Sequence, residues 1–213
     1  SFSHSVVDAV SLRILAADLE RVWKEPPVQS TDIPVSPDRS AITWAAYLET
    51  IAQSEALRKQ SAYWTGLSQK ITSSFASHQS DQNADEKVID SGANTRTQTG
   101  RLQSSLSTRL ADRFPTLRQQ HDVFLGALLQ SWCSLADTNI MAATLESHGR
   151  DQMRQGGITA LSVGNLTGRF PALFEVSSSD SLRHTVDRLA GTIDSMPQGG
   201  VGFGLLRHLC CDT

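Results

Sequence analysis

Apolar side chains recur at helical spacing in the first third of the chain. Between residues 10 and 24 the large apolar positions repeat every three to five residues, which predicts an amphipathic helix that a pair of prolines ends. Ser40 is a suitable N-cap for a helix over residues 41–53, and a third helix is expected over 54–69. The apolar stripe expected to be buried on these two helices consists of Trp44, Tyr47, Leu48, Ile51, Leu57, Tyr63, Trp64 and Leu67.

The polar stretch over residues 73–100 separates this region from the rest. It is rich in Ser, Gln, Asn, Asp and Thr, and such a stretch buries too little apolar surface to offset the entropy of ordering it. We therefore expect residues 1–72 to be the end of an N-terminal lobe, 73–98 a mobile inter-lobe loop, and 99–213 part of a C-terminal lobe.

Three short runs in the second half predict strands: residues 99–106, the apolar run 140–145 and residues 159–163. Helical patterns alternate with these runs, and this alternation favours an α/β fold. Four helices are expected there. The first is short, capped by Ser107 and ended by Pro115, and the second is a buried helix over 122–135 bearing Val123, Phe124, Leu125, Leu128, Leu129 and Trp132. The third is capped by Asp180 or Ser181 and has Leu182, Val186, Leu189 and Ile193 on one face, and the last follows the glycine-rich turn 199–204.

Composition and charge exclude several classes of protein. The 213 residues carry 19 Lys and Arg against 22 Asp and Glu, so the net charge of −3 argues against a nucleic-acid binder. No apolar run is long enough to span a membrane. Cys133, Cys210 and Cys211 fit neither a disulfide framework nor a zinc site, and we expect three reduced thiols in a cytoplasmic protein. No pair of histidines has metal-ligand spacing, so no metal is expected.

Two ionisable residues stand at the ends of apolar segments. His4 precedes Asp8 by four residues, and Glu146 directly follows the apolar run 140–145. Glu146 is therefore expected to be partly desolvated, an environment that suits a proton-transfer group. A histidine or glutamate at a strand end is more often a hydrogen-bonded structural residue, so the residues alone leave both interpretations open.

Five segments carry a resemblance to a known family. Residues 3–11, S-H-S-V-V-D-A-V-S, resemble the H-H-x-x-x-D-G-x-S signature of condensation-type domains of non-ribosomal peptide synthetases. Residues 146–151, E-S-H-G-R-D, resemble the E-G-H-G-R-E motif of their epimerization domains. Residues 122–128, 162–171 and 197–206 are similar to the D-x-L-L-x-A-L, T-V-G-W-F-T-x-x-Y/F-P and P-x-x-G-x-G-F/Y-G-x-L segments of the same domains, in the same order.

The resemblance implies a fold and an activity. The implied fold is α/β, chloramphenicol-acetyltransferase-like and two-lobed, and apparently incomplete at both ends of this chain. The implied activity is epimerization of the α-carbon of an aminoacyl or peptidyl thioester, which would make the protein a cofactor-independent isomerase. The implied partners are a peptidyl carrier protein, whose 4'-phosphopantetheine arm holds the substrate, and other synthetase domains in the same polypeptide.

The resemblance also carries functional residues over to this chain. The implied proton-transfer residues are His4 and Glu146, and the implied supporting residues are Asp8, His148, Arg150, Asn165 and Gly202. Asp8 is expected to fix its loop through an arginine, and His148 and Arg150 to support the loop that presents Glu146. Gly200, Gly202 and Gly204 are expected to allow close approach of the backbone. We further expect His4 and Glu146 to face one cavity at the lobe junction.

Departures from the family pattern leave two other functions open. Ser3 replaces the first histidine, Ala9 and Ser147 replace glycines, and Asn165 with Leu166 replaces the aromatic pair. One alternative is a condensation-type, amide-forming acyltransferase, in which His4 acts on an amine and Glu146 is incidental. The other is a degenerate, non-catalytic module that docks a carrier protein.

The motif order also bears on the length of the chain. It begins on a motif that is central in the family and stops after the glycine-rich segment, so we expect a central piece of a longer domain. Such a piece would expose sheet edges, and we expect the isolated chain to be poorly soluble.

Overall fold

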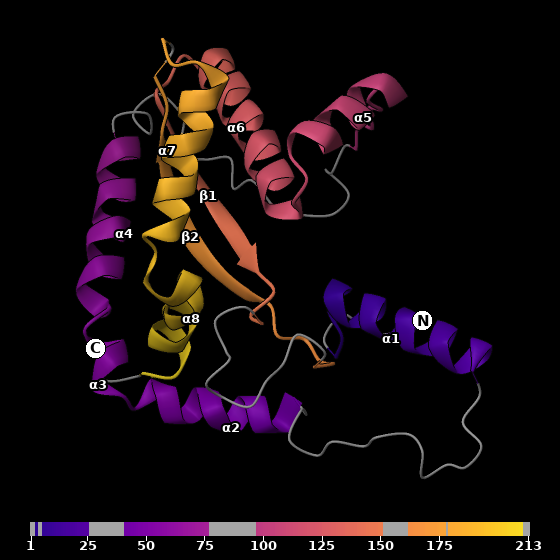
Figure 1. The fold of residues 1–213 in the computed structure, drawn as a ribbon. Coiled ribbons are helices and arrows are strands. Elements are labelled where there is room, and N and C mark those ends of the chain that lie inside the picture. The colour runs from indigo at the N-terminus through magenta and orange to yellow at the C-terminus, as the bar shows by residue number, and fades with distance from the viewer. Residues whose placement is uncertain are drawn as a thin grey trace. The chain divides into compact units, whose positions relative to one another are not determined.

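The computed structural model describes residues 3, 6–25, 41–76, 97–150, 162–177 and 179–210. The second half contains both helices and strands, as the α/β prediction requires, but its two described strands follow one another directly, so the expected alternation of helices and strands is wrong (Figure 1). The elements in chain order are α1 (Ala9–Lys24), α2 (Ala41–Ala52), α3 (Glu55–Arg58), α4 (Ser61–Ala76), α5 (Ser104–Arg113), α6 (Leu117–Leu135), β1 (Ile140–Ser147), β2 (Gly168–Glu175), α7 (Leu182–Asp194), a 3-10 turn (Pro197–Gly200) and α8 (Val201–His208).

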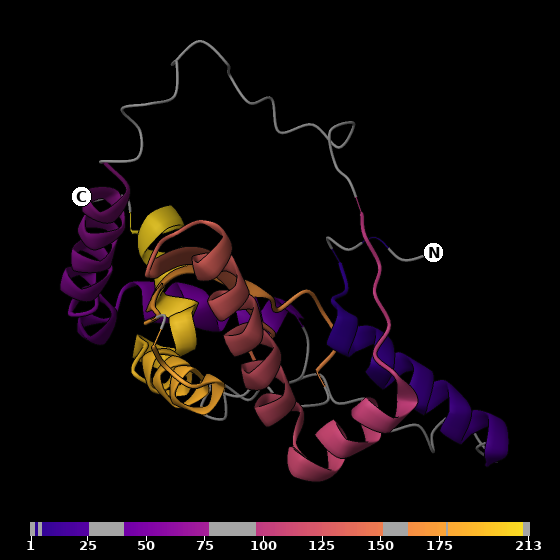
Figure 2. The ribbon, with the colours of Figure 1, turned by 90° about the horizontal axis from the view of Figure 1, so that it is seen from above.

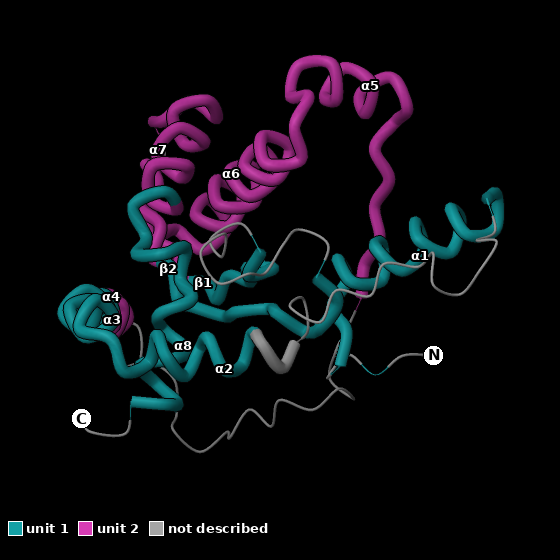
Figure 3. Tube along the Cα trace, turned by 60° about the horizontal axis from the view of Figure 1, so that its bottom comes forward, with its two compact units in different colours: residues 1–67, 143–172, 194–213 teal, residues 68–142, 173–193 magenta. Residues whose placement is uncertain are grey.

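The chain divides into two compact units (Figure 3). Unit 1 comprises residues 1–67, 143–172 and 194–213, and unit 2 comprises 68–142 and 173–193. Both strands pass from one unit into the other. The expected mobile loop over 73–98 stays a prediction, since residues 77–96 lie outside the described part of the chain and α4 continues to Ala76.

Strands β1 and β2 form a two-stranded antiparallel sheet. The Val176 N–H donates to the Asn139 carbonyl at 2.7 Å where β1 begins and β2 ends. Equally many residues separate Asn139 from Glu146 and Arg169 from Val176, so this register sets Glu146 opposite Arg169. Hydrogen-bonded and non-hydrogen-bonded residue pairs alternate along an antiparallel ladder. Counted from Asn139 and Val176, Glu146 and Arg169 form a non-hydrogen-bonded pair, the kind in which opposing side chains come closest.

Strand β2 was not predicted, and the strand expected over 159–163 is wrong where it can be tested. Residues 159–161 lie outside the described residues, and residues 162 and 163 are not in a strand. In β2 the alternate residues Phe170, Ala172 and Phe174 are buried, which is the pattern of a strand with one face in a core. Pro171 obscures this pattern in the sequence, because proline counts against a strand interior.

The strand expected over 99–106 is also wrong. Residues 97–103 have no regular structure, and α5 begins at Ser104, three residues before the predicted cap at Ser107. Leu106 and Leu110 recur at helical spacing within it, and the helix ends before Pro115 as predicted.

Helix α6 is longer and less buried than expected. It begins at Leu117 because Thr116 forms a capping box with Gln119, two residues that bond to each other's backbone N–H groups. Val123 and Leu129 are buried as predicted. The expectation of a buried helix is otherwise wrong, since the side chains exposed on it include Phe124, Leu128 and Trp132. Exposed apolar side chains also lie on the second half of α1, where Leu19 and Trp23 face solvent.

Unit 1 has an aromatic core around α4. The predicted stripe is confirmed, since Trp44, Leu57 and Trp64 are buried and its other members are half-buried. The third helix is split, however: Ser54 caps α3 by accepting from the Leu57 N–H, and α4 starts anew at Ser61. The Trp64 ring then packs against Phe203 of α8 and Phe170 of β2, with centroids 5.3 and 6.4 Å apart.

Two glycines of the 199–204 turn permit this packing. Gly200 has φ of 88° and a Cβ there would run into the Phe170 ring, while a Cβ at Gly202 would run into the Gln60 side chain. The expectation of close approach is wrong for Gly204, which has open space where its Cβ would stand. The turn leads into α8 as predicted.

Unit 2 is built on the contact between α6 and α7, which lie side by side (Figure 2). Ser181, one of the two predicted caps, accepts from the His184 N–H at 3.2 Å and starts α7. The Gln130 amide of α6 donates to the Thr185 hydroxyl of α7 at 2.9 Å. At Gly126 the two helices approach so closely that a Cβ would lie 2.8 Å from a Val186 methyl carbon.

The change Gly126→Ala is expected to destabilise the protein. Overpacking against the stiff Val186 side chain costs about 1–3 kcal/mol, which equals or exceeds the gain of about 1 kcal/mol in helix propensity. Gly191→Ala in α7 is the matched control, because nothing lies within 4 Å of a Cβ there. Urea unfolding should show a loss of stability for the first variant and a gain of up to about 1 kcal/mol for the second. Equal effects would contradict the close contact.

Candidate functional site

A buried ion pair joins the segment after His4 to the segment after Glu146. The side chains of Asp8 and Arg150 are 3% and 2% exposed. The Arg150 guanidinium donates from Nη1 to Asp8 Oδ2 at 2.8 Å and from Nη2 to Asp8 Oδ1 at 2.9 Å. This two-point geometry is the strongest form of a carboxylate–guanidinium contact. It supplies the arginine partner expected for Asp8.

Backbone groups of residues 162–166 complete the network around the pair. Arg150 donates from Nε and Nη2 to the Ser162 carbonyl, at 3.2 and 3.0 Å, and the Leu166 N–H donates to Asp8 Oδ2 at 3.2 Å. The Ser11 hydroxyl lies within hydrogen-bond distance of Asp8, of Arg150 and of both backbone groups of Gly164. Three separate segments of the chain therefore meet at one buried charge pair.

Asp8 also caps helix α1. Its Oδ1 accepts from the Ser11 backbone N–H at 2.8 Å. Ala9, where the family signature has glycine, is the first residue of this helix, so an ordinary backbone conformation suffices there. The family signature thus places its aspartate at a helix start, where a carboxylate is favoured.

The pKa of Asp8 lies well below its ordinary value. Burial alone raises the pKa, but the hydrogen bonds from Arg150, Ser11 and Leu166 outweigh burial and lower it. Asp8 is therefore a fixed negative charge near neutral pH.

Glu146 lies in a different environment from the one expected. Its side chain is 55% exposed, so the partial desolvation expected from the preceding apolar run is wrong. Arg169, opposite it on β2, donates from Nε to Glu146 Oε1 at 2.8 Å. Because Arg169 is 71% exposed, this ion pair orients the carboxylate but contributes little to stability.

A tight turn connects Glu146 to Arg150. His148 is exposed; its Nδ1 lies 3.3 Å from the Arg150 N–H, and its carbonyl accepts from Arg150 Nη1 at 3.0 Å. Gly149 has φ of 69°, and a Cβ there would run into the Leu166 carbonyl oxygen. Glycine is therefore required in this turn, which fixes the path from the exposed carboxylate to the buried guanidinium.

His4 lies outside the described residues. The remaining predicted site residues, Asn165 and Gly202, lie in unit 1. Asn165 is exposed, and its Oδ1 accepts from the Thr167 N–H at 3.2 Å. Its neighbour Leu166 is buried with Trp44. Gly202 belongs to the aromatic core and not to the Asp8–Arg150 network. The expected shared cavity of His4 and Glu146 stays a prediction.

A pocket in unit 1 borders the partner of Glu146. We name this cavity of about 400 Å³ the α8 pocket; it is lined by Thr144, Arg169, Phe170, Pro171, Phe203, Gly204, Arg207 and His208. Arg169 therefore both contacts Glu146 and lines the α8 pocket. Sequence patterns did not point to Arg169 and Arg207, because neither occupies a signature position and only the β1–β2 register brings Arg169 to Glu146.

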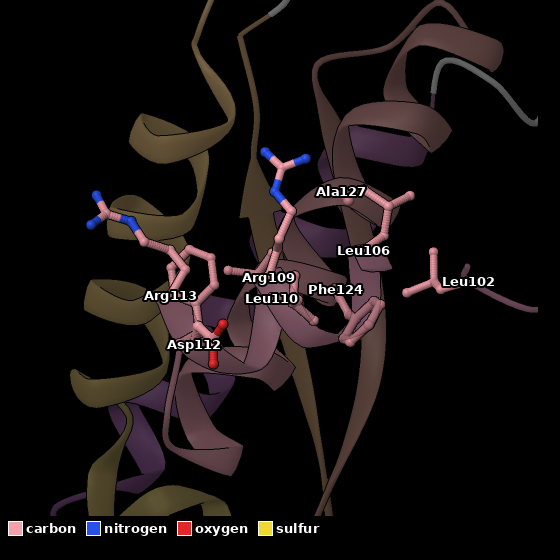
Figure 4. A pocket seen from close by; sticks show the side chains of 10 residues that line it. Leu102, Leu106, Arg109, Leu110, Asp112, Arg113, Phe124 and Ala127 are labelled. Atoms are coloured by element: carbon pink, nitrogen blue, oxygen red, sulfur yellow. The ribbon is translucent and has the colours of Figure 1, made fainter. Parts of the chain in front are cut away.

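A larger cavity of about 770 Å³ lies in unit 2, along α5 and α6 (Figure 4). Its apolar lining includes Leu106, Leu110 and Phe124, and the guanidinium groups of Arg109 and Arg113 extend away from the Phe124 ring. None of the predicted site residues lines this cavity.

The described residues offer neither a metal site nor a membrane-spanning helix. Among them, no group of three or more His, Cys, Asp or Glu is arranged to hold a metal ion. No helix in the described part of the chain is long and apolar enough to cross a membrane.

Comparisons with known proteins agree on one family. The family model described as "Condensation domain" matches residues 1–212. A linear gramicidin synthase of Brevibacillus parabrevis is 29% identical over 99% of this chain, and surfactin synthase subunit 1 of Bacillus subtilis is 25% identical over 97%. The chain spans only 3% and 6% of the lengths of these two relatives.

Solved structures share the fold. The epimerization domain from the third module of tyrocidine synthetase B matches 98% of this chain with a TM-score of 0.72 and 24% identity. The first condensation domain of the calcium-dependent antibiotic synthetase matches 97% with a TM-score of 0.61 and 16% identity. This chain covers 46% and 44% of those two chains, less than half of each.

The change Asp8→Asn is expected to cost about 3–5 kcal/mol of unfolding free energy, because it leaves the Arg150 charge buried without a counter-charge. Asp18→Asn on the same helix is the control, since Asp18 forms an exposed ion pair with Arg21, and its loss should cost less than about 1 kcal/mol. The double change Asp8→Asn, Arg150→Met removes both charges and should recover part of the loss. Denaturant unfolding measures all three, and equal losses for the two single variants would refute the dependence on the buried pair.

The same pair predicts an acid-sensitive stability. Because the pKa of Asp8 is lower in the folded chain than its unfolded value of about 3.9, the folded chain binds fewer protons. The contribution of Asp8 should be complete above that value and decline as the pH falls below about 4. Unfolding free energies measured from pH 6 to pH 3 should show the gap between wild type and Asp8→Asn narrowing with acidity. A gap that is constant over this range would contradict the lowered pKa.

Proposed function

Since the chain belongs to the condensation-domain family and has the chloramphenicol-acetyltransferase-like α/β fold of its structural neighbours, we propose that it epimerises the α-carbon of a carrier-bound aminoacyl or peptidyl thioester. The observation that carries this proposal is the buried Asp8–Arg150 pair. Asp8 follows His4 by four residues and Arg150 follows Glu146 by four residues, so the pair ties together the two segments that carry the proposed proton-transfer groups.

The reaction needs two groups that exchange protons with one carbon. The α-proton of a thioester is more acidic than that of an amide, because a thioester is less stabilised by resonance. One group takes this proton, the bonding electrons move into the enolate, and a second group returns a proton to the opposite face. No electron is lost or gained, and the chemistry asks for no cofactor beyond the phosphopantetheine arm that holds the substrate.

We assign these two roles to His4 and Glu146. The exposed carboxylate of Glu146 suits a group that must reach a substrate, and Arg169 restricts its orientation. Asp8 is excluded from proton transfer by its buried, fully bonded and ionised state. Asp8, Arg150 and His148 are positioning residues that set the turn between Glu146 and the buried network.

A condensation-type acyltransferase is the second candidate function. Condensation domains of solved structure share this fold, so the fold alone is compatible with amide formation. In that case Glu146 would be incidental. The motif around Glu146 and the glycine-rich segment together favour epimerization. A non-catalytic module that docks a carrier protein is the third candidate, motivated by Ser3, Ala9 and Asn165.

The change Glu146→Gln is expected to lower the rate of α-proton exchange by a factor of about 100 or more, since a positioned acid or base contributes about 10² to 10⁴. Exchange is followed as loss of α-deuterium from a thioester on its carrier protein, in the complete protein. Glu175→Gln is the matched control, because Glu175 is also an exposed glutamate at a strand end, 70% exposed and 3.9 Å from Arg188. It should change the rate by less than about twofold.

The same assay separates the three candidate functions. Undiminished exchange in Glu146→Gln would remove Glu146 from the mechanism. Chiral analysis of the released product shows inverted configuration without a new amide if the protein is an epimerase. A new amide with retained configuration would indicate the acyltransferase, and carrier binding without turnover of any thioester would indicate the docking module.

A further inference from the structure

The α8 pocket combines an aromatic wall with a cationic rim. Phe170 and Phe203 supply the wall, and both pack on Trp64, which is 4% exposed. Arg169, Arg207 and His208 supply basic groups on the rim. Among the described residues that line the pocket, none is acidic.

Of the two arginines on this rim, Arg169 pairs with the Glu146 carboxylate, at 2.8 Å. This bond uses the Nε of Arg169. Within the described part of the chain the two terminal nitrogens of its guanidinium form no ion pair, and a guanidinium has donors for a second contact there. Arg207 is exposed on the last turn of α8 and pairs with no carboxylate among the described residues. Two arginines therefore line a pocket whose described lining includes no acidic residue.

We infer that the α8 pocket binds an anionic group of the carrier-bound substrate, held between Arg169 and Arg207 with its carbon stem on Phe170 and Phe203. A planar guanidinium matches a carboxylate or a phosphate through two parallel hydrogen bonds. A volume of about 400 Å³ is at the small end of ligand pockets, which suits one substituent of the substrate and not the whole acyl chain.

This inference rests on the proposed function, because it places the pocket beside Glu146 on the substrate's path. Arg169 is the link between them. An anion in the pocket would contact the same guanidinium group that donates from Nε to Glu146. Binding of the substituent would then orient the carboxylate proposed to act on the α-carbon.

Two parts of the substrate could supply the anion. One is a side-chain carboxylate, as in an aspartyl or glutamyl thioester, and the other is the phosphate of the phosphopantetheine arm. The two sources share one chemistry, and matched substrates separate them.

The test changes Arg207 and leaves Arg169 in place, because Arg169 contacts the proposed catalytic carboxylate. Arg207→Gln is compared with Arg207→Lys, which keeps the charge, and with Arg58→Gln, which removes an exposed arginine that does not line the pocket. Binding of non-reactive amide analogues of aspartyl- and asparaginyl-phosphopantetheine is measured by calorimetry in the complete protein, together with α-deuterium exchange from the corresponding thioesters.

Arg207→Gln should weaken binding of the aspartyl analogue about tenfold, as expected for loss of one charged hydrogen bond, with about twofold or less for the asparaginyl analogue. Arg207→Lys should recover part of the loss, and Arg58→Gln should cause none. Arg207→Gln could instead weaken the binding of both analogues equally. If that effect disappears with pantetheine analogues that lack the phosphate, the phosphate is the anion. Loss of affinity that depends on neither group would overturn the inference.

The binding measurement stands apart from catalysis. If analogues bind with the expected dependence on Arg207 but no thioester exchanges its α-proton in the wild type, the epimerase proposal fails and the anion pocket stands. If exchange occurs with rates and affinities that Arg207→Gln leaves unchanged for all substrates, the pocket inference fails and the epimerase proposal stands.

Discussion

The geometry of the candidate site depends on the buried pair of Asp8 and Arg150. Taking two charges out of water costs several kcal/mol for each ion, and only close contact and further hydrogen bonds offset that cost. Here both carboxylate oxygens and the guanidinium nitrogens find partners among residues 8–11, 148 and 162–166. Displacing any of these segments would leave a buried charge underbonded. The pair therefore fixes where α1 starts, where the turn after β1 runs, and how the segment before β2 lies.

The buried pair gives Asp8 an environment very different from that of Glu146. Asp8 is buried and fully hydrogen-bonded, which keeps it ionised and immobile. Glu146 is exposed and held only by Arg169 among the described residues, so it can meet a substrate. Environments that differ this strongly assign different tasks to the same functional group. The structure thereby supports the assignment of proton transfer to Glu146 and of positioning to Asp8, within the epimerase proposal.

Local patterns predicted the elements that carry their own signals. Helices α1, α2, α7 and α8 and strand β1 follow from apolar periodicity, prolines and caps, and the signature motifs predicted an arginine partner for Asp8. Strand β2 was missed because Pro171 interrupts its alternation, and residues 99–106 were assigned to a strand because a run of mixed residues has no clear period. The exposure of Glu146 could not be derived either, since burial depends on which elements cover a strand end and not on the strand's own sequence.

The role of Arg169 shows why the rest of the site required a structure. Its contact with Glu146 exists only because β1 and β2 pair in one register, which the Val176–Asn139 bond marks at one end. A slip by one residue would turn Phe170, Ala172 and Phe174 out of the core and carry Arg169 away from Glu146. The buried face of β2 thus selects the register, and the register in turn brings a cation to the proposed catalytic carboxylate. Core packing and site geometry are consequences of the same pairing.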